Sequence, residues 1–111
     1  MVNSRAKGKR GELEVVHRFQ DHGYLCVRRG DASRGEADLV GVPVIHPEVK
    51  FRETTEIDKW MAQAMRDAEE KYDEDRMPVV IHRRSRMPLK VTMLFEDFMT
   101  LLGGYIENEQ K

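Results

Sequence analysis

The chain has 111 residues, of which 40% are hydrophobic and 35% charged, and its formal net charge is −1. That length and balance predict one globular domain over residues 1–111 and exclude a disordered chain. No apolar run approaches the roughly 18 residues that span a bilayer, so we expect no membrane partner. A single cysteine, Cys26, excludes an internal disulfide and favours a reducing, cytoplasmic setting.

The small net charge hides a strong segregation of charge along the chain. Residues 1–34 carry eight Lys/Arg against four Asp/Glu, and residues 76–90 carry five against none. Residues 53–75 carry three against nine. Such segregation permits a basic face, of the kind that a nucleic-acid binder needs, beside an acidic one, although charge runs in general are more often plain solvated surface.

The N-terminal part is predicted to be helical. Residues 1–7 are polar and basic, and we expect them to form a loose arm. A helix is predicted from about Gly8 to His22 and should end at Gly23, because glycine readily closes a helix. At about 100° per residue, its apolar stripe runs through Leu13, Val15, Val16 and Phe19.

Glu12 falls on this apolar stripe, whereas Glu14 is predicted to face solvent. A carboxylate in an apolar stripe is costly to bury unless it is paired or holds a metal ion. A salt bridge to an internal lysine would explain its position. We favour a role for Glu12 in a catalytic site.

A strand is predicted over residues 24–29, where side chains alternate between two faces. Residues 30–35 are polar and bounded by glycines, which predicts a loop. This loop lies shortly before Asp38, and it is either an ordinary surface turn or a segment that closes over a ligand.

The stretch 38–50 is predicted to form a strand, a tight Gly-Val-Pro turn and a second strand. Side chains alternate along a strand, so Glu48 and Lys50 lie on one face of the second strand. If the two strands pair as a hairpin, Asp38 meets Glu48 and Lys50 at one end of it. Pro47 lacks an amide hydrogen, which predicts an edge position or a bulge there.

Further elements are predicted from hydrophobic periodicity. They are a helix over residues 56–72, strands over 77–82 and 89–93 joined by a basic turn at 83–86, and a short helix from Phe95 to Leu102 with its apolar side inward. Gly103-Gly104 is expected to end that helix, and residues 105–111 to form a tail. The order α-β-β-β-α-β-β-α predicts an α/β fold with one mixed sheet flanked by helices.

Two carboxylates and an ammonium at one end of a hairpin suit phosphodiester hydrolysis, which needs an oxygen-bound metal ion, a water and positive charge at the phosphate. Asp38 and Glu48 would bind Mg²⁺, for which Mn²⁺ would substitute, and the Val49 carbonyl would add a third ligand. Lys50 would orient or deprotonate the water, or meet the phosphate. Glu12 would complete the site through a water or a second ion.

Three motifs occur in the order Gly8-Lys9-Arg10-Gly11-Glu12, Asp38 and Glu48-Val49-Lys50. In these the chain resembles the PD-(D/E)xK nuclease superfamily, and within it the Holliday junction resolvases of archaea and the small resolvase-like nucleases of phages. The resemblance covers nearly the whole chain and implies a restriction-endonuclease-like fold. It also implies catalytic roles for Gln63, on the following helix, and Ser33, in the loop before the aspartate.

The resemblance implies a Mg²⁺-dependent endonuclease that nicks four-way DNA junctions in the cytoplasm of a bacterial host. Two symmetric nicks need two active sites, so the partner of the chain is expected to be a second copy, in a homodimer on branched DNA. A nickase or DNA-repair nuclease of the same fold is one alternative. A DNA-binding module without catalysis is another, but such a module has no need of the complete set of acidic residues and lysine.

Basic residues near the motifs are expected to contact DNA phosphates. They are Lys7, Lys9, Arg10, Arg34, Arg83, Arg84 and Arg86. Apolar positions near Tyr72, Met77 and Phe95 are the candidates for a two-fold interface, and the sequence does not choose between them.

Overall fold

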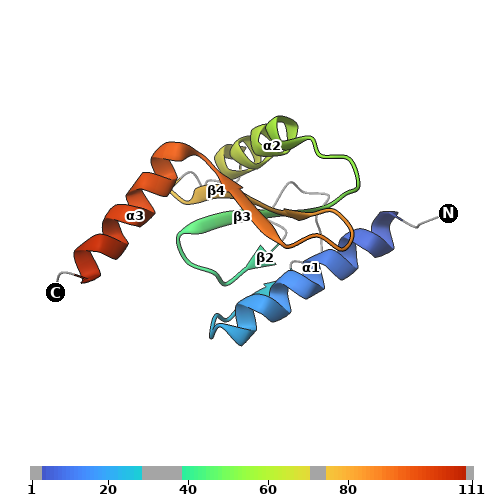
Figure 1. Ribbon diagram of the computed structural model, residues 1–111, viewed down its shortest axis with the longest axis horizontal. Helices are drawn as coiled ribbons and strands as arrows, with labels where there is room; N and C mark the ends of the chain where they lie inside the picture. The colour runs from blue at the N-terminus through green and yellow to red at the C-terminus, as the bar shows by residue number, and fades with distance from the viewer. Residues whose placement is uncertain (1–3, 29–38, 71–74, 110–111) are drawn as a thin grey trace.

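The computed structural model describes residues 4–28, 39–70 and 75–109, with side chains from Gly8 onward. Its elements are α1 (Ser4–Asp21), β1 (Val27–Arg28), β2 (Leu39–Val40), β3 (Ile45–Phe51), α2 (Ile57–Glu70), β4 (Met77–Arg83), β5 (Lys90–Met93) and α3 (Phe95–Glu109) (Figure 1). The predicted α/β class is confirmed at this level. No helix in the described residues is long and apolar enough to cross a membrane.

The described strands form two small sheets instead of the single sheet predicted. β1 and β2 pair antiparallel, and β3, β4 and β5 form a second sheet in that order. β4 runs parallel to β3 and antiparallel to β5. The predicted hairpin between the two strands of residues 38–50 is therefore wrong. The first of these strands pairs with β1, whose pairing covers only two residues of the strand predicted over 24–29, and the second pairs with β4.

The link between β2 and β3 explains why these neighbouring strands do not form a hairpin. Gly41 adopts a φ of +99°, and a Cβ there would lie 1.8 Å from the Leu25 carbonyl oxygen, so only glycine fits. Val44 also has a positive φ, of 79°. Its carbonyl oxygen accepts a hydrogen bond of 2.7 Å from the amide of Met77, which seats the start of β3 on β4.

The three-stranded sheet is covered by α1 on one face and α2 on the other. Val79 and Ile81 of β4 pack in the cluster that contains the buried residues of α1, whereas Val80 between them packs with buried residues of α2. β3 lies at the edge of this sheet within the described residues, which confirms the edge position predicted from Pro47. α2, β4 and β5 lie close to their predicted ranges.

An ion pair holds α1 on the sheet. Glu14, predicted to face solvent, accepts two hydrogen bonds of 2.7 Å each from the Arg83 guanidinium. That guanidinium also lies 4.6 Å from the centre of the Phe51 ring. Arg83 belongs to β4 and not to a basic turn, and its guanidinium has a structural partner in Glu14, whereas its contact with DNA stays a prediction. Helix α1 starts at Ser4, within the predicted arm, and ends before Gly23 as predicted.

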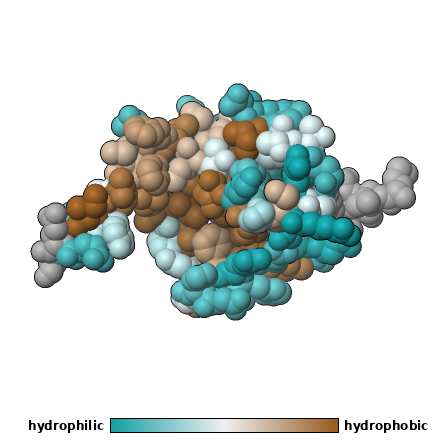
Figure 2. Space-filling model, in the orientation of Figure 1, coloured by the Kyte–Doolittle hydropathy of each residue, from teal (hydrophilic) through white to brown (hydrophobic). Residues whose placement is uncertain are grey.

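The C-terminal helix differs most from its prediction. α3 continues through Gly103-Gly104 to Glu109, so it does not end at the glycines, and the expected tail is helical as far as it is described. None of its residues is buried. Its apolar side chains, predicted to face inward, are exposed because no other described element covers them: α3 extends away from the sheet, and apolar side chains gather along it (Figures 1 and 2).

Arg83→Gln is expected to lower the free energy of unfolding by about 1–2 kcal/mol, since it removes the paired hydrogen bonds to Glu14 on a half-exposed surface. Arg84→Gln, one residue further and exposed, should change it by less than about 0.5 kcal/mol. Urea unfolding at pH 7 measures both. Equal losses would show that the Glu14 pair does not hold the helix.

Candidate active site

Strand β3 presents the E-x-K motif to the face covered by α2. In the parallel register, Glu48 lies beside Val80 and Lys50 beside His82 on β4. Val80 packs against α2, and the His82 ring centre lies 5.9 Å from that of Trp60 on α2. The predicted common face of Glu48 and Lys50 therefore agrees with the observed register.

Glu48 is deeply buried, with 2% of its surface exposed. Its Oε1 atom has no hydrogen-bond partner among the described residues. Nε2 of His46 lies 3.7 Å from this atom, on the same face of β3, and forms an ion pair with Glu48 only when the ring is protonated. A carboxylate in such a place costs several kcal/mol unless a cation or a proton neutralises it. The site is therefore one that favours positive charge at Glu48.

A second carboxylate reaches the same place from α2. Asp67 is 9% exposed and forms a side-chain hydrogen bond with Glu48. Burial, followed by this hydrogen bond and the negative charge of Glu48, raises the pKa of Asp67 from 3.8 to about 6. The two acids therefore form a buried pair in which Asp67 holds a proton at mildly acidic pH.

Asp67 was not among the site residues predicted from the sequence. Gln63, which it did select, lies on α2 one turn before Asp67 and is half-buried. The signal was present in the helical spacing, because Asp67 follows the buried residues Trp60 and Ala64 by seven and three positions. His46 also could have been found, since it precedes Glu48 by two residues on a strand.

Glu12 is not brought together with Glu48 and Lys50. It lies on α1, which covers the opposite face of the sheet, and its carboxylate accepts a 2.5 Å hydrogen bond from Nε of Arg28. The Glu12 side chain is 13% exposed, so its predicted burial agrees with the structure. The observed partner is an arginine of β1, which favours the salt-bridge alternative, and a catalytic role for Glu12 stays a prediction.

Part of the predicted site falls outside the described residues. Asp38, Ser33 and Arg34 belong to the undescribed segment 29–38, and the side chain of Lys7 is also outside the description. Among the residues that are described, no group of three or more His, Cys, Asp or Glu is arranged to hold a metal ion. The described residues thus supply a buried pair of acids, and a complete ligand set would need further oxygen donors.

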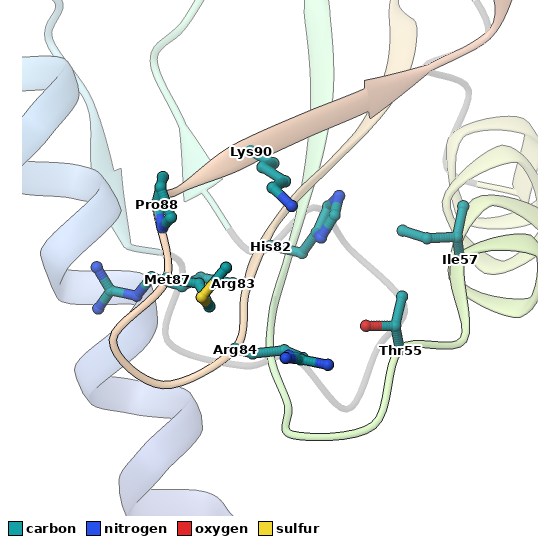
Figure 3. Close-up of a pocket in the computed structure, with 8 residues that line it drawn as sticks. All are labelled: Thr55, Ile57, His82, Arg83, Arg84, Met87, Pro88 and Lys90. Atoms are coloured by element: carbon teal, nitrogen blue, oxygen red, sulfur yellow. The ribbon is translucent and has the colours of Figure 1, made fainter.

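The remaining basic residues lie on neighbouring elements. Lys9 and Arg10 are exposed on α1, and Arg84 and Arg86 are exposed in the turn between β4 and β5. This turn lies beside α1, to which the strand before it is bound through Arg83 (Figure 3). These four cations are therefore available to an anionic partner.

Comparison with known proteins adds no relative to this description. No family model matches the chain, and no curated protein matches it significantly.

Asp67→Asn is expected to stabilise the metal-free protein at pH 8. Because the pKa of Asp67 rises from 3.8 to about 6 on folding, the stability that its protonated form contributes is complete below pH 3.8 and is lost as pH rises to about 6. That difference corresponds to at most about 3 kcal/mol. The variant, which has no charge to bury, should be more stable than wild type by up to this amount at pH 8.

The measurement is urea unfolding in EDTA between pH 4 and pH 8. Glu69→Gln, an exposed carboxylate of the same helix, is the matched control and should leave this pH dependence in place. A stability difference between Asp67→Asn and wild type that is the same at pH 4 and pH 8 would contradict the buried acid pair.

Proposed function

We propose that the chain is a Mg²⁺-dependent DNA endonuclease of the PD-(D/E)xK type, with a restriction-endonuclease-like fold, that cleaves four-way junctions in a bacterial cytoplasm. The observation that carries the proposal is the face of β3, where Glu48 is buried against Asp67 and Lys50 follows two residues later. Two buried carboxylates destabilise a fold unless a cation or a proton neutralises them. Acids whose pKa is shifted by burial and by each other are concentrated at functional sites.

Glu48 fits the part of a Mg²⁺ ligand because its buried Oε1 atom has no hydrogen-bond partner among the described residues. Asp67 supplies the second described carboxylate, and the Asp38 carboxylate and the Val49 carbonyl are the further ligands we propose. Mg²⁺ bound there would polarise the phosphate and lower the pKa of a water. Below about pH 6, a proton on Asp67 limits the repulsion between the two acids while the site is empty of cations.

Lys50 occupies the accessible end of the site. Glu48 is 2% exposed, whereas Lys50, roughly 7 Å further along β3, is half-buried. Its ammonium is suited to meeting a phosphate oxygen or orienting the attacking water. DNA would approach from this end, where the exposed cations Arg84 and Arg86 of the β4–β5 turn also lie. Lys9 and Arg10 are exposed on α1, the helix beside that turn (Figure 3).

The same site would serve a nickase or a repair nuclease. What favours a junction nuclease is a surface for a second copy of the chain, which two symmetric nicks require. That surface is α3. Its exposed apolar residues recur with the three- and four-residue spacing of paired helices and are Phe95, Phe98, Met99, Leu102, Tyr105 and Ile106.

An isolated helix of this length is marginal in water, and two central glycines weaken it further by about 1 kcal/mol each. α3 therefore depends on a partner for its stability. We propose that α3 of one protomer packs against α3 of the other, which would bury the apolar stripe of both. Of the three interface candidates of the sequence, Tyr72 lies outside the described residues, and the surface we propose is the one near Phe95.

Glu48→Gln is expected to lower junction cleavage by at least about 100-fold, because it removes a metal ligand, while junction binding in EDTA stays close to wild type. Asp38→Asn should behave in the same way. Glu56→Gln, an exposed carboxylate near the start of α2, is the matched control and should cleave normally. A folded Glu48→Gln protein that cleaves at a near-native rate would refute the assignment of the site.

Leu102→Asp is expected to convert a dimer into a monomer, since it places a charge in the proposed α3 interface. Thr100→Asp adds the same charge to the same helix off the apolar stripe and should leave the dimer intact. Sedimentation velocity at micromolar concentration distinguishes the species. A wild-type chain that is monomeric both free and on a junction would contradict the dimer, as would equal disruption by the two variants.

A further inference from the structure

A second polar site lies next to the E-x-K face. A cavity of about 410 Å³ opens between the start of α2, the end of β4 and the start of β5 (Figure 3). Four of the side chains that line it can donate hydrogen bonds into it: Thr55, His82, Arg84 and Lys90. Among the described residues, no acidic side chain lines it. The cavity is thus suited to an anion.

The charges of the cavity are not neutralised by the described part of the protein. Arg83 also lines it, but its guanidinium is turned toward α1, where Glu14 binds it (Figure 3). The Arg84 guanidinium and the Thr55 hydroxyl face each other, and the Lys90 ammonium points toward His82 (Figure 3). No carboxylate of the described residues pairs with Arg84 or Lys90.

His82 contributes a hydrogen-bonding group and not a charge. Its Nε2 atom lies 2.9 Å from the Thr92 hydroxyl, and burial, followed by the charge of Lys90, lowers the pKa of its ring. The ring is therefore neutral at pH 7, and the positive charge of the cavity comes from Arg84 and Lys90. Two cations, a hydroxyl and a neutral imidazole match the oxygens of one phosphodiester anion.

The turn that carries Arg84 is fixed. The carboxylate of Glu53 accepts hydrogen bonds from both the amide and the hydroxyl of Ser85. The amide of Met87 donates a hydrogen bond of 3.0 Å to the Arg84 carbonyl oxygen, which closes the turn. A turn held in this way orders the backbone that carries Arg84 before a ligand arrives, which lowers the entropic cost of binding.

The register of the sheet places this cavity beside the proposed active site. His82 lies directly beside Lys50 on the neighbouring strand, and both side chains point to the α2 face. The cavity is thus one strand, about 4.8 Å, away from the lysine of the motif. That is a short enough step for neighbouring phosphates of one DNA strand to occupy the two places.

We propose that Arg84, Lys90, Thr55 and His82 form a subsite for the DNA phosphate next to the scissile one, on the side of Lys50. The identity of the ligand rests on the proposed function, whereas the anion site itself rests on the cavity. Lys90 and Thr55 were not among the DNA contacts predicted from the sequence. Arg84 was, and it acquires a defined partner here.

The test measures binding of four-way junctions in EDTA, in which single phosphates near the branch point are replaced one at a time by neutral methylphosphonates. On the unmodified junction, Lys90→Gln should bind about fivefold more weakly near 0.15 M salt, because one lost phosphate contact removes about 0.9 from the slope of log K against log salt. When the methylphosphonate replaces the phosphate bound in the subsite, wild type should lose about the same fivefold affinity, and Lys90→Gln should lose no further affinity.

Arg86→Gln is the matched control, since Arg86 carries the same charge as Lys90 on the turn that leads to β5 but does not line the cavity. Any affinity that Arg86→Gln loses should be lost equally on the unmodified junction and on every modified one. The subsite would be refuted if Lys90→Gln bound fivefold more weakly than wild type to every modified junction. It would also be refuted if the methylphosphonate that removes the difference between the two proteins lay far from the bond that wild type cleaves. If one methylphosphonate removes the difference but wild type cleaves no junction in Mg²⁺, the result would refute the proposed nuclease activity and support the anion site.

Discussion

The proposed site of this protein depends on the burial of the Glu48 carboxylate. This carboxylate lies in a parallel pair of strands beneath a helix, where water cannot solvate it, and its partners are the side chains that β3 and α2 bring to it, His46 and Asp67. Parallel pairing requires the long crossover through α2, and that same crossover supplies Asp67. The fold and the acid pair thus come from one topological feature. A proton neutralises the pair only at low pH, so near pH 7 a cation is the remaining means of offsetting its charge.

Local features of the site could be predicted from the sequence, and its long-range partners could not. Glu48 and Lys50 share a face because strands alternate, which holds whatever the strand pairs with. The pairing itself was predicted wrongly, since consecutive strands usually pair with each other. Here Gly41 and Val44 bend the chain between them, and β3 pairs with a strand that follows some 30 residues later. The predicted α/β class is nevertheless correct, because it depends on which helices and strands form and not on which strands pair.

The helices show the same limit. Periodicity correctly placed Glu12 on the inner side of α1, but it could not reveal that Arg28 of β1 pairs with it. Asp67 could have been found from the spacing of α2, whereas its contact with Glu48 depends on how the helix lies over the sheet. The apolar stripe of α3 was also visible in the sequence. Whether a stripe faces its own core or another molecule is decided by what covers it, and in the described residues nothing does.

We propose that the face of Glu48 and Lys50 hydrolyses branched DNA with Mg²⁺. The most direct measurement is cleavage by the purified chain of four matched DNAs, a four-way junction, a flap, a duplex and a single strand, with Mg²⁺ or with EDTA. We expect paired nicks in the junction that require Mg²⁺, with slower or no cleavage of the other three DNAs. A folded protein that binds the junction but cleaves none of these DNAs in Mg²⁺, or cleaves equally well in EDTA, would contradict this proposal.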